Sequence, residues 1–296
     1  MTEQSSIFNL EVMLETSPEI VVHESEDLQR KITEMHGSEI PPAAILDFDA
    51  NLTSFPGRSL NCFKDPRFQE IQVHMLKKFG HYEIQMETHP NAKTMVEWWY
   101  KLTAKALRRY GFNSPKEAQA SASNIELKDG ALEALRLLDE RNIPTLIFSA
   151  GLGDPIIYHL RSHGLEPPVA SNFMFDSYGP QAIYHHTGEF GLRIYSSTKT
   201  MEHFINPETN ELDQRLEDFF RPTQWQIVIG DGLHDIKMPH GAPNFDPEKT
   251  INIATLPEDK RNYAEKYFEA GYDVIVFGDS FEPVTKLLEH VLPAAA

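Results

Sequence analysis

The chain has 296 residues, of which 41% are hydrophobic and 24% are charged, a composition typical of a globular protein with a sizeable core. Its 44 acidic residues against 27 Lys and Arg give a net charge of -17, which argues against a nucleic-acid polymer or an anionic membrane as a partner. A single cysteine, Cys62, excludes an intrachain disulfide and fits a reducing compartment. The first residues lack the features of a secretory signal, and no apolar run approaches the roughly 20 residues of a membrane span, so we expect a cytoplasmic protein.

Short runs rich in Val, Ile and Phe alternate with helical patterns, which predicts an α/β fold with a parallel sheet wrapped by helices. The predicted strands are residues 43–48, 144–149, 225–231, 250–256 and 273–277. Ser25 is placed to cap an early helix that ends near Gly37. Leu132, Leu135 and Leu138 are spaced to share one face of a helix before the second strand. Because ligands of such sheets bind beyond the carboxyl ends of the strands, functional residues are expected there.

A long segment between the first two predicted strands has a mostly helical pattern. Residues 93–109 carry the apolar pattern of one helix. Ser114, followed by Pro, Lys and Glu, is placed as the N-cap of another. We therefore expect a helical cap domain over residues 59–123, inserted after the first strand of an α/β core formed by residues 1–58 and 124–296.

The first predicted strand ends in two carboxylates, in the stretch ILDFDANLT. Side chains of a strand alternate between its faces, so Asp47 and Asp49 point the same way with their charges close together. Such a pair repels itself unless a cation lies beside it. Alone, the pattern also fits a turn cap or a pair of solvated acids, so a catalytic interpretation depends on what the other strand ends supply.

Three further segments supply what an aspartyl nucleophile needs. In FSAGLGD, Ser149 and the backbone of Ala150 lie where a strand meets a helix, which suits a phosphate, although an ordinary turn fits as well. Lys199 would neutralise a phosphate, although a surface lysine is the plainer interpretation. In IGDGLHD, Asp231 follows another strand, and together with Asp47 it would give Mg2+ the carboxylates that it prefers, the alternative being a glycine-rich turn.

These segments resemble the four motifs of the haloacid dehalogenase superfamily of phosphatases. More narrowly, MVEWW, LIFSAGLGD, ASNFM and YDVIVFGD are similar to the cytosolic 5′-nucleotidase III family, which holds the pyrimidine and the 7-methylguanosine phosphate-specific 5′-nucleotidases. The resemblance runs from about residue 23 to residue 292. It implies a Rossmann-like parallel sheet with helices on both faces and a helical cap. It also implies Mg2+-dependent hydrolysis of a nucleoside 5′-monophosphate, a pyrimidine or 7-methylguanosine one, through an aspartyl-phosphate.

The resemblance further implies roles for the residues at the strand ends. Asp47 would be the nucleophile, Asp49 the general acid and base, and Lys199 the cation beside the phosphate. Mg2+ would bind Asp231 together with the Asp47 side chain and the Asp49 carbonyl, with Asp235 as a second acid near the metal. The chemistry agrees, because a carboxylate can attack phosphorus while a second one gives a proton to the leaving oxygen and later takes one from water.

The cap would supply the contacts to the base. Glu97 matches the carboxylate that reads the base in the family, and Ser123 matches a second substrate contact. A Trp at position 99 suits a cationic methylated base through a cation–π contact. Because neighbouring helix positions face different ways, at most one of Trp98 and Trp99 lines the pocket, and the other belongs to the core of the cap.

One residue departs from the pattern of the family. Asn51 stands where the first motif has Thr, and we expect it to lower turnover without removing metal binding. It keeps open a second interpretation, a nucleotide-binding homologue with impaired catalysis. A phosphatase of another small phosphomonoester is a third interpretation, which the MVEW match argues against. A monomer or a weak homodimer is expected.

Overall fold

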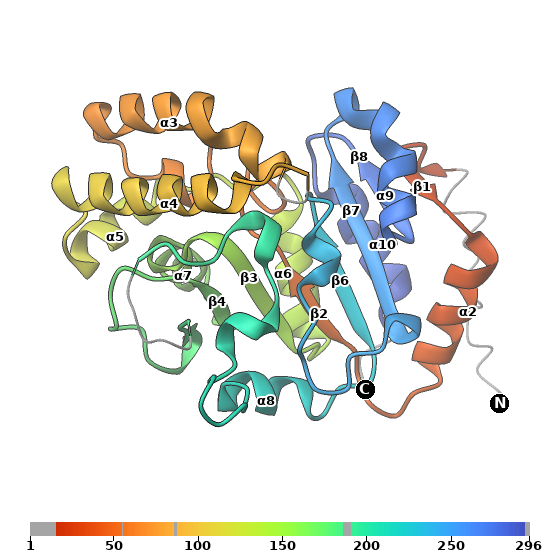
Figure 1. Cartoon of the computed structure of the whole chain (residues 1–296). Coiled ribbons are helices and arrows are strands. Elements are labelled where there is room, and N and C mark those ends of the chain that lie inside the picture. The colour runs from red at the N-terminus through yellow and green to blue at the C-terminus, as the bar shows by residue number, and fades with distance from the viewer. Residues whose placement is uncertain (1–15, 55, 86–87, 186–190, 294–296) are drawn as a thin grey trace, which may run out of the picture.

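The computed structural model describes residues 16–54, 56–85, 88–185 and 191–293, and in these ranges eight strands form one sheet (Figure 1). The strands are β1 (Ile20–Val22), β2 (Ala43–Leu46), β3 (Thr145–Leu152), β4 (Val169–Asn172), β5 (Ala182–Ile183), β6 (Gln226–Gly230), β7 (Thr250–Leu256) and β8 (Val274–Phe277). Their order is β1-β8-β7-β6-β2-β3-β4-β5. β1 is antiparallel to β8, and every other neighbouring pair is parallel. β2 therefore lies inside the sheet, between β6 and β3.

The five predicted strands are present as β2, β3, β6, β7 and β8, which confirms the predicted parallel sheet. β1, β4 and β5 were not predicted. β1 and β5 have 3 and 2 residues, too few to carry a recognisable apolar pattern, and β4 ends in the polar pair Ser171 and Asn172. Their places in the sheet follow from pairing with longer neighbours rather than from local sequence.

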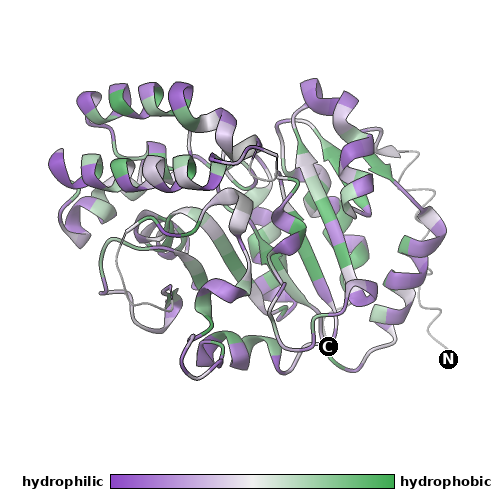
Figure 2. Ribbon diagram, viewed as in Figure 1, coloured by the Kyte–Doolittle hydropathy of each residue, from purple (hydrophilic) through white to green (hydrophobic). Residues whose placement is uncertain are grey.

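Helices cover both faces of the sheet. They are α2 (Ser25–His36), α3 (Pro66–Ile84), α4 (Ala92–Arg109), α5 (Pro115–Ala122), α6 (Ala131–Glu140), α7 (Gly153–Ser162), α8 (Gln214–Phe220), α9 (Ala264–Ala270) and α10 (Glu282–Val291). Ala44 and Leu46 of β2 pack in a cluster with α2, α6, α7 and α10, whereas Ile45 packs on the other face with α8. Figure 2 shows the apolar strands in green between helices whose outer turns are purple. None of the helices in the described ranges has the length and apolar content needed to cross a bilayer.

Two predicted helix starts differ in detail from the structure. Ser25 is the first residue of α2, and Glu24 takes the N-cap position, while Gly37 follows the helix as predicted. Ser114 does occupy the N-cap of α5, but its side chain makes no capping hydrogen bond. The apolar pattern locates a helix, whereas the backbone conformation of its cap is not visible in the sequence.

Helices α3, α4 and α5 occupy the long segment between β2 and β3 and lie at the upper left of Figure 1. Their apolar side chains form a cluster that continues to Leu152 at the end of β3. The segments that lead into and out of this insert are paired, since the N–H of Ser54 donates to Glu126 O at 3.0 Å and the N–H of Lys128 donates to Leu52 O at 2.8 Å. This pairing supports the proposal that residues 59–123 form a cap.

Candidate active site

The candidate site begins where β2 ends. The backbone N–H of Asp47 donates to Ile229 O of β6 at 2.9 Å, so the sheet still holds this residue. Asp47 Oδ1 accepts from the N–H of Phe48 at 2.8 Å and contacts Lys199 Nζ at 2.9 Å. Among the described residues, the N–H of Phe48 and Nζ of Lys199 both contact Asp47 Oδ1. Asp47 Oδ2 is therefore the oxygen that can contact a substrate or a metal.

Two acids that follow β6 complete a group of three carboxylates. Because β2 and β6 are parallel neighbours, with Leu46 beside Ile229, their carboxyl ends meet at one edge of the sheet. Ligand atoms of Asp47, Asp231 and Asp235 all lie within 4.8 Å of one another. The structure thus brings together one acid that follows β2 and two acids that follow β6.

The turn after β6 is fixed from two sides. A Cβ on Gly230 would collide with the side chain of Asp235, so this glycine makes room for the third acid. Asp235 Oδ2 accepts from the N–H of Gly232 at 2.8 Å, and the Tyr267 hydroxyl donates to Asp231 O at 2.8 Å. The Asp235 carboxylate and the backbone of Asp231 are therefore held in place before any ligand binds.

Lys199 is the cation of this site. Its Nζ lies 2.9 Å from Asp47 Oδ1 and 2.6 Å from Asp235 Oδ1, and its side chain is 2% exposed. Burial lowers the pKa of Lys199, but the carboxylates of Asp235 and Asp47 outweigh burial and raise this pKa above its ordinary value. Lys199 is therefore an ammonium at neutral pH. Three carboxylates and one ammonium leave two negative charges, which a divalent cation would balance.

The three carboxylates suit a cation that prefers oxygen ligands. Burial raises the pKa of Asp47 well above its ordinary value; Lys199 opposes this shift, and Asp235 and Asp231 add to it. Burial, and then the charge of Asp235, also raises the pKa of Asp231. A bound cation would reverse these shifts because it favours the ionised carboxylates. The donor set therefore fits a divalent metal ion such as Mg2+.

Asp49 lies beside this group and is held by Ser59. Asp49 Oδ1 accepts from the Ser59 N–H at 2.6 Å, and Oδ2 accepts from the Ser59 hydroxyl at 2.6 Å. Burial raises the pKa of Asp49, and the two bonds from Ser59 act in the opposite direction. A Cβ on Gly151 would collide with both Asp49 Oδ2 and Ser59 Oγ, so only a glycine leaves this contact undisturbed.

β3 carries Ser149 and Ala150 to the same edge. The pairing of β3 with β4 shifts register between Phe148 and Leu152, so the strand is irregular where these small residues lie. Ser149 is buried, and its Oγ accepts from the N–H of Gly151 at 3.0 Å. The hydroxyl keeps its own proton to donate to an anion. Contact of these two residues with a phosphate is compatible with this arrangement and stays a prediction.

Asn51 connects the ends of three strands. It is fully buried, and its Nδ2 donates to Asp47 O at 2.8 Å and to Ile229 O at 3.2 Å. Its Oδ1 accepts from the Thr255 hydroxyl of β7 at 2.8 Å. An amide offers two donor protons and an acceptor, whereas a Thr hydroxyl in its place has one proton. Asn51 therefore has a structural function here, and its effect on turnover stays a prediction.

A separate cavity of about 630 Å3 lies beside α4. Lys93, Glu97 and Lys101 recur every four residues and so share the helix face that lines it. The other lining residues are His185, Arg193, Tyr195, Thr198, Thr200, Glu202 and His203. Glu97, predicted to read a base, is thus part of a cavity that carries both charges.

One backbone segment, residues 198–200, connects this cavity with the acidic centre, by which we mean Asp47, Asp231, Asp235 and Lys199. Thr198 and Thr200 line the cavity, while Lys199 between them reaches Asp47. Residues 198–200 therefore contribute side chains both to the cavity and to the group of acids at Asp47.

Ser123 and Trp99, both predicted to contact the substrate, belong neither to the acidic centre nor to the lining of the Glu97 cavity. Ser123 is exposed after α5, and its hydroxyl donates to Ala120 O at 3.0 Å. Trp99 packs on the apolar cluster of the insert, next to Tyr100, whereas Trp98 is 60% exposed. Trp99 is thus the tryptophan that belongs to the core of the insert, and neither one is among the residues that line the Glu97 cavity. Contacts of Ser123 and Trp99 with a substrate stay predictions.

Ser59 is the residue of this site that the sequence did not reveal. It lies 10 residues after Asp49 in a stretch without an apolar pattern. Its hydrogen bonds to Asp49 depend on how the chain turns after β2. The small Gly151 was a visible signal of a close approach, but the sequence does not say which side chain comes near it.

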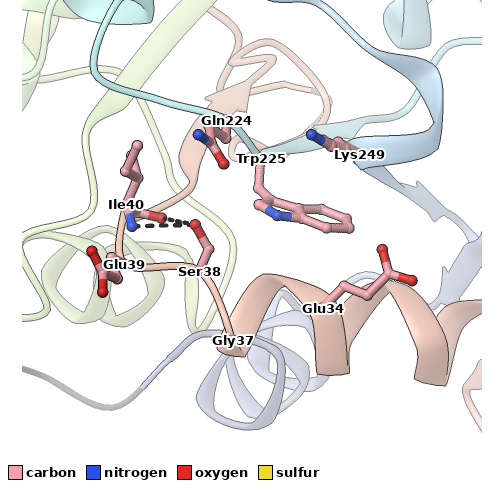
Figure 3. A pocket seen from close by; sticks show the side chains of 8 residues that line it. All are labelled: Glu34, Gly37, Ser38, Glu39, Ile40, Gln224, Trp225 and Lys249. Atoms are coloured by element: carbon pink, nitrogen blue, oxygen red, sulfur yellow. Dashed lines mark hydrogen bonds between the residues drawn. The ribbon is translucent and has the colours of Figure 1, made fainter.

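Another cavity, of about 370 Å3, lies at the opposite edge of the sheet (Figure 3). Its lining includes Ile40, Trp225 and Lys249, which precede β2, β6 and β7. Figure 3 shows the Trp225 ring in this cavity, with Glu34 of α2 across from it. Within the described ranges the one group of acids close enough to hold a metal is the group at Asp47. The carboxyl edge of the sheet is therefore the candidate active site.

Comparison with known proteins identifies relatives of this chain. The model of the family described as pyrimidine 5′-nucleotidase (UMPH-1) matches residues 60–292. Human 7-methylguanosine phosphate-specific 5′-nucleotidase is 27% identical over 266 residues, which cover 84% of each chain.

Solved structures show the same fold. Cytosolic 5′-nucleotidase IIIB bound to cytidine has a TM-score of 0.71 at 20% identity, and the match covers 96% of this chain and 97% of that one. A phospho-aspartyl intermediate analogue of phosphoserine phosphatase has a TM-score of 0.50 at 15% identity, over 84% and 99% of the two chains. The predicted α/β fold of the haloacid dehalogenase type is confirmed.

Proposed function

Since the chain belongs to the pyrimidine 5′-nucleotidase (UMPH-1) family, and is thus a phosphoric monoester hydrolase, we propose that it hydrolyses nucleoside 5′-monophosphates with Mg2+ at the Asp47 site. The observation that carries the proposal is the group of Asp47, Asp231 and Asp235 around a buried Lys199. This arrangement gives a nucleophile, a cation for the phosphate and a place for a divalent metal at one edge of the sheet.

In the first step Asp47 attacks the phosphorus atom of the substrate. A bond forms between a carboxylate oxygen and phosphorus, and the bond between phosphorus and the ribose 5′-oxygen breaks. The electron pair of the broken bond stays on the 5′-oxygen, which takes a proton from Asp49, and the nucleoside leaves. Two contacts hold Asp47 Oδ1, which supports Oδ2 as the attacking atom.

Charge explains why this step needs cations. Bringing a phosphate charge to about 4 Å from a carboxylate costs on the order of 4 kcal/mol per charge pair at an effective dielectric constant of 20. Lys199, fixed against Asp47, offsets part of this repulsion. Mg2+, when bound by Asp47, Asp231, Asp235 and the Asp49 carbonyl, would supply positive charge for the phosphate oxygens.

In the second step water hydrolyses the aspartyl-phosphate. Asp49, now ionised, takes a proton from the water as its oxygen bonds to phosphorus, and the bond from phosphorus to Asp47 breaks. Phosphate leaves, Asp47 returns to a carboxylate, and Asp49 carries a proton for the next cycle. Asp49 therefore has to hold one orientation in two protonation states.

The cavity beside α4 is the proposed place of the base. Glu97 can accept a hydrogen bond from the amino group of cytosine or pair with the charge of 7-methylguanine, so both substrate classes remain part of the proposal. The names of related proteins, such as cytosolic 5′-nucleotidase IIIB, support a cytosolic location. A monomer or weak homodimer is proposed as the working state.

Phosphate release from CMP, UMP and 7-methylguanosine monophosphate, each with Mg2+ and with EDTA, tests the proposal. We expect nucleoside and phosphate with Mg2+ and neither with EDTA. Asp47→Asn should lower turnover by at least about 1,000-fold, whereas Asp218→Asn on the exposed face of α8 should not change it. If none of the three nucleotides is hydrolysed, the proposal is wrong, and nucleotide binding without catalysis becomes the better interpretation. Release from a simple phosphomonoester alone would favour a phosphatase of another substrate.

A further inference from the structure

The N–H and the hydroxyl of Ser59 make three hydrogen bonds beside the group of acids at Asp47. Its N–H donates to Asp49 Oδ1 and its hydroxyl donates to Asp49 Oδ2, each at 2.6 Å. Its Oγ also accepts from the N–H of Leu152 at 2.9 Å. One residue thus contacts both oxygens of Asp49 and is itself tied to the end of β3.

The position of Ser59 is fixed by its surroundings. Ser59 is fully buried and begins the short 3-10 turn Ser59–Asn61 that leads from β2 into the helical insert. On one side Gly151 lies so close that a Cβ would collide with Ser59 Oγ. On the other side, Asn124 Nδ2 donates to Cys62 O at 2.9 Å and ties the turn to the returning chain. Ser59 therefore cannot move without disturbing three segments.

A hydroxyl is suited to a partner that changes its protonation state. It can donate to an ionised carboxylate, and it can accept from a protonated one. Ser59 occupies one lone-pair site on each Asp49 oxygen, so a second site on each oxygen remains for the proton that passes to and from the substrate. The N–H of Ser59 donates to Asp49 Oδ1 in both states. The pair can thus keep its geometry while a proton arrives and leaves.

We propose that Ser59 is a positioning residue, which holds the Asp49 carboxyl group in the orientation that serves both proton transfers. The proposal rests on the function proposed above, in which Asp49 is the general acid and base. Without the Ser59 hydroxyl, Asp49 keeps a single bond to the N–H of residue 59, and its carboxyl group is free to turn. Proton delivery to the leaving 5′-oxygen then becomes the impaired step.

The test compares two leaving groups on the same nucleoside. One substrate is CMP, and the other is its analogue with sulfur in place of the bridging 5′-oxygen, which leaves as a thiolate without a proton. For Ser59→Ala we expect kcat/KM for CMP to fall about 10- to 100-fold, because general acid catalysis is worth about 100-fold or more. For the sulfur analogue we expect a change of less than about 3-fold, because the sulfur leaves without an acid. If the wild type prefers 7-methylguanosine monophosphate or UMP, that nucleotide and its sulfur analogue are compared instead.

Three matched variants complete the experiment. Asp49→Asn should show the same difference between the two substrates with a larger loss. Ser59→Thr keeps the hydroxyl and should recover most of the activity on CMP. Ser121→Ala removes a hydroxyl from another buried serine of the insert, away from Asp49, and should change neither substrate.

The results separate this proposal from the proposed function. Equal losses on both substrates, or no loss on either, would show that Ser59 does not act through proton transfer and would overturn the inference. If Ser59→Ala is unfolded by circular dichroism, Ser59→Cys, which keeps the size of the side chain, is compared on the same two substrates and decides in the same way. A wild-type protein that releases no phosphate from any nucleotide would overturn the proposed function itself. Two results together support the inference and the proposed function. The wild-type protein releases phosphate from a nucleotide, and Ser59→Ala loses activity on CMP but keeps its activity on the sulfur analogue.

Discussion

The acidic centre around Asp47 and the cavity around Glu97 lie on two sides of one backbone segment, yet they are built differently. In the centre, Asp47, Asp235 and Lys199 are buried and bonded to one another or to strand ends. In the cavity, Lys93 and Lys101 project from an exposed helix face. The geometry of the acidic centre is set by the strands of the sheet. The chemistry of the cavity is set by the side chains that α4 and the loop around residues 198–203 carry.

This difference has an electrostatic consequence. Charges in the buried centre interact strongly and are hardly screened, whereas charges on an exposed face are weakened by water and salt. Changes in the centre should therefore affect both folding and chemistry, and changes in the cavity should affect the choice of base. The substitutions below test this division.

The largest effect is expected from Lys199→Met. It leaves the buried carboxylates of Asp47 and Asp235 without their ammonium partner, which costs about 3–5 kcal/mol in the free energy of unfolding of the metal-free protein. Turnover should fall by about 100-fold or more. Urea denaturation with and without Mg2+ measures the first effect, and Mg2+ should restore part of the stability. Lys116→Met on the exposed face of α5 is the control, and an equal loss there would contradict the division.

Asn51→Thr should come next. Loss of hydrogen bonds to the carbonyls of Asp47 and Ile229 in a buried place should lower the free energy of unfolding by about 1–3 kcal/mol. Thr255→Val removes the hydroxyl on the other side of Asn51 and should destabilise in the same direction by less. Phosphate release from the Thr variant tests whether Asn51 also lowers turnover, and an unchanged turnover number would sink that hypothesis.

Glu97→Gln should act on the substrate rather than on the fold. The side chain keeps its shape and loses its charge, so we expect KM for the preferred nucleotide to rise about 10-fold, with kcat and the unfolding temperature nearly unchanged. Steady-state kinetics on the three nucleotides measure this effect. Glu133→Gln on the exposed side of α6 is the matched control. A large fall in kcat without a change in KM would show that the cavity takes part in the chemistry.

The smallest effect is expected from Ala50→Gly. Ala50, between Asp49 and Asn51, has a φ of 67°, a left-handed conformation that costs an L-residue about 1–2 kcal/mol. Glycine removes this strain but loses more backbone entropy on folding, so the net gain in unfolding free energy should be up to about 1 kcal/mol. Asn210→Gly, at a φ of 57° in a residue type that tolerates this conformation, should gain less. Thermal unfolding of both variants measures the difference, and a loss of stability in the Ala50 variant would contradict it.

The central sheet could be predicted because its signals are local. Each long strand carries its own apolar run, and parallel strands bring their carboxyl ends to one edge, so Asp47 and Asp231 were expected together. Lys199 follows no predicted strand, so its own segment fits a surface lysine as well, and the resemblance to a family is what favoured its place beside the phosphate. In the structure its Nζ meets Asp47 and Asp235, as an ammonium between two acids.

The sequence alone specified five of the eight strands, β2, β3, β6, β7 and β8, and the acids that follow β2 and β6, because hydrophobic periodicity and strand polarity are properties of short segments. Tertiary structure decided that Ser59 holds Asp49, that Asn51 connects β2, β6 and β7, and that Glu97 lies in a cavity apart from Trp99. Each of these contacts joins atoms from segments without a shared pattern. Their distances depend on how the sheet, its turns and the helical insert pack together, and no local sequence signal encodes that packing.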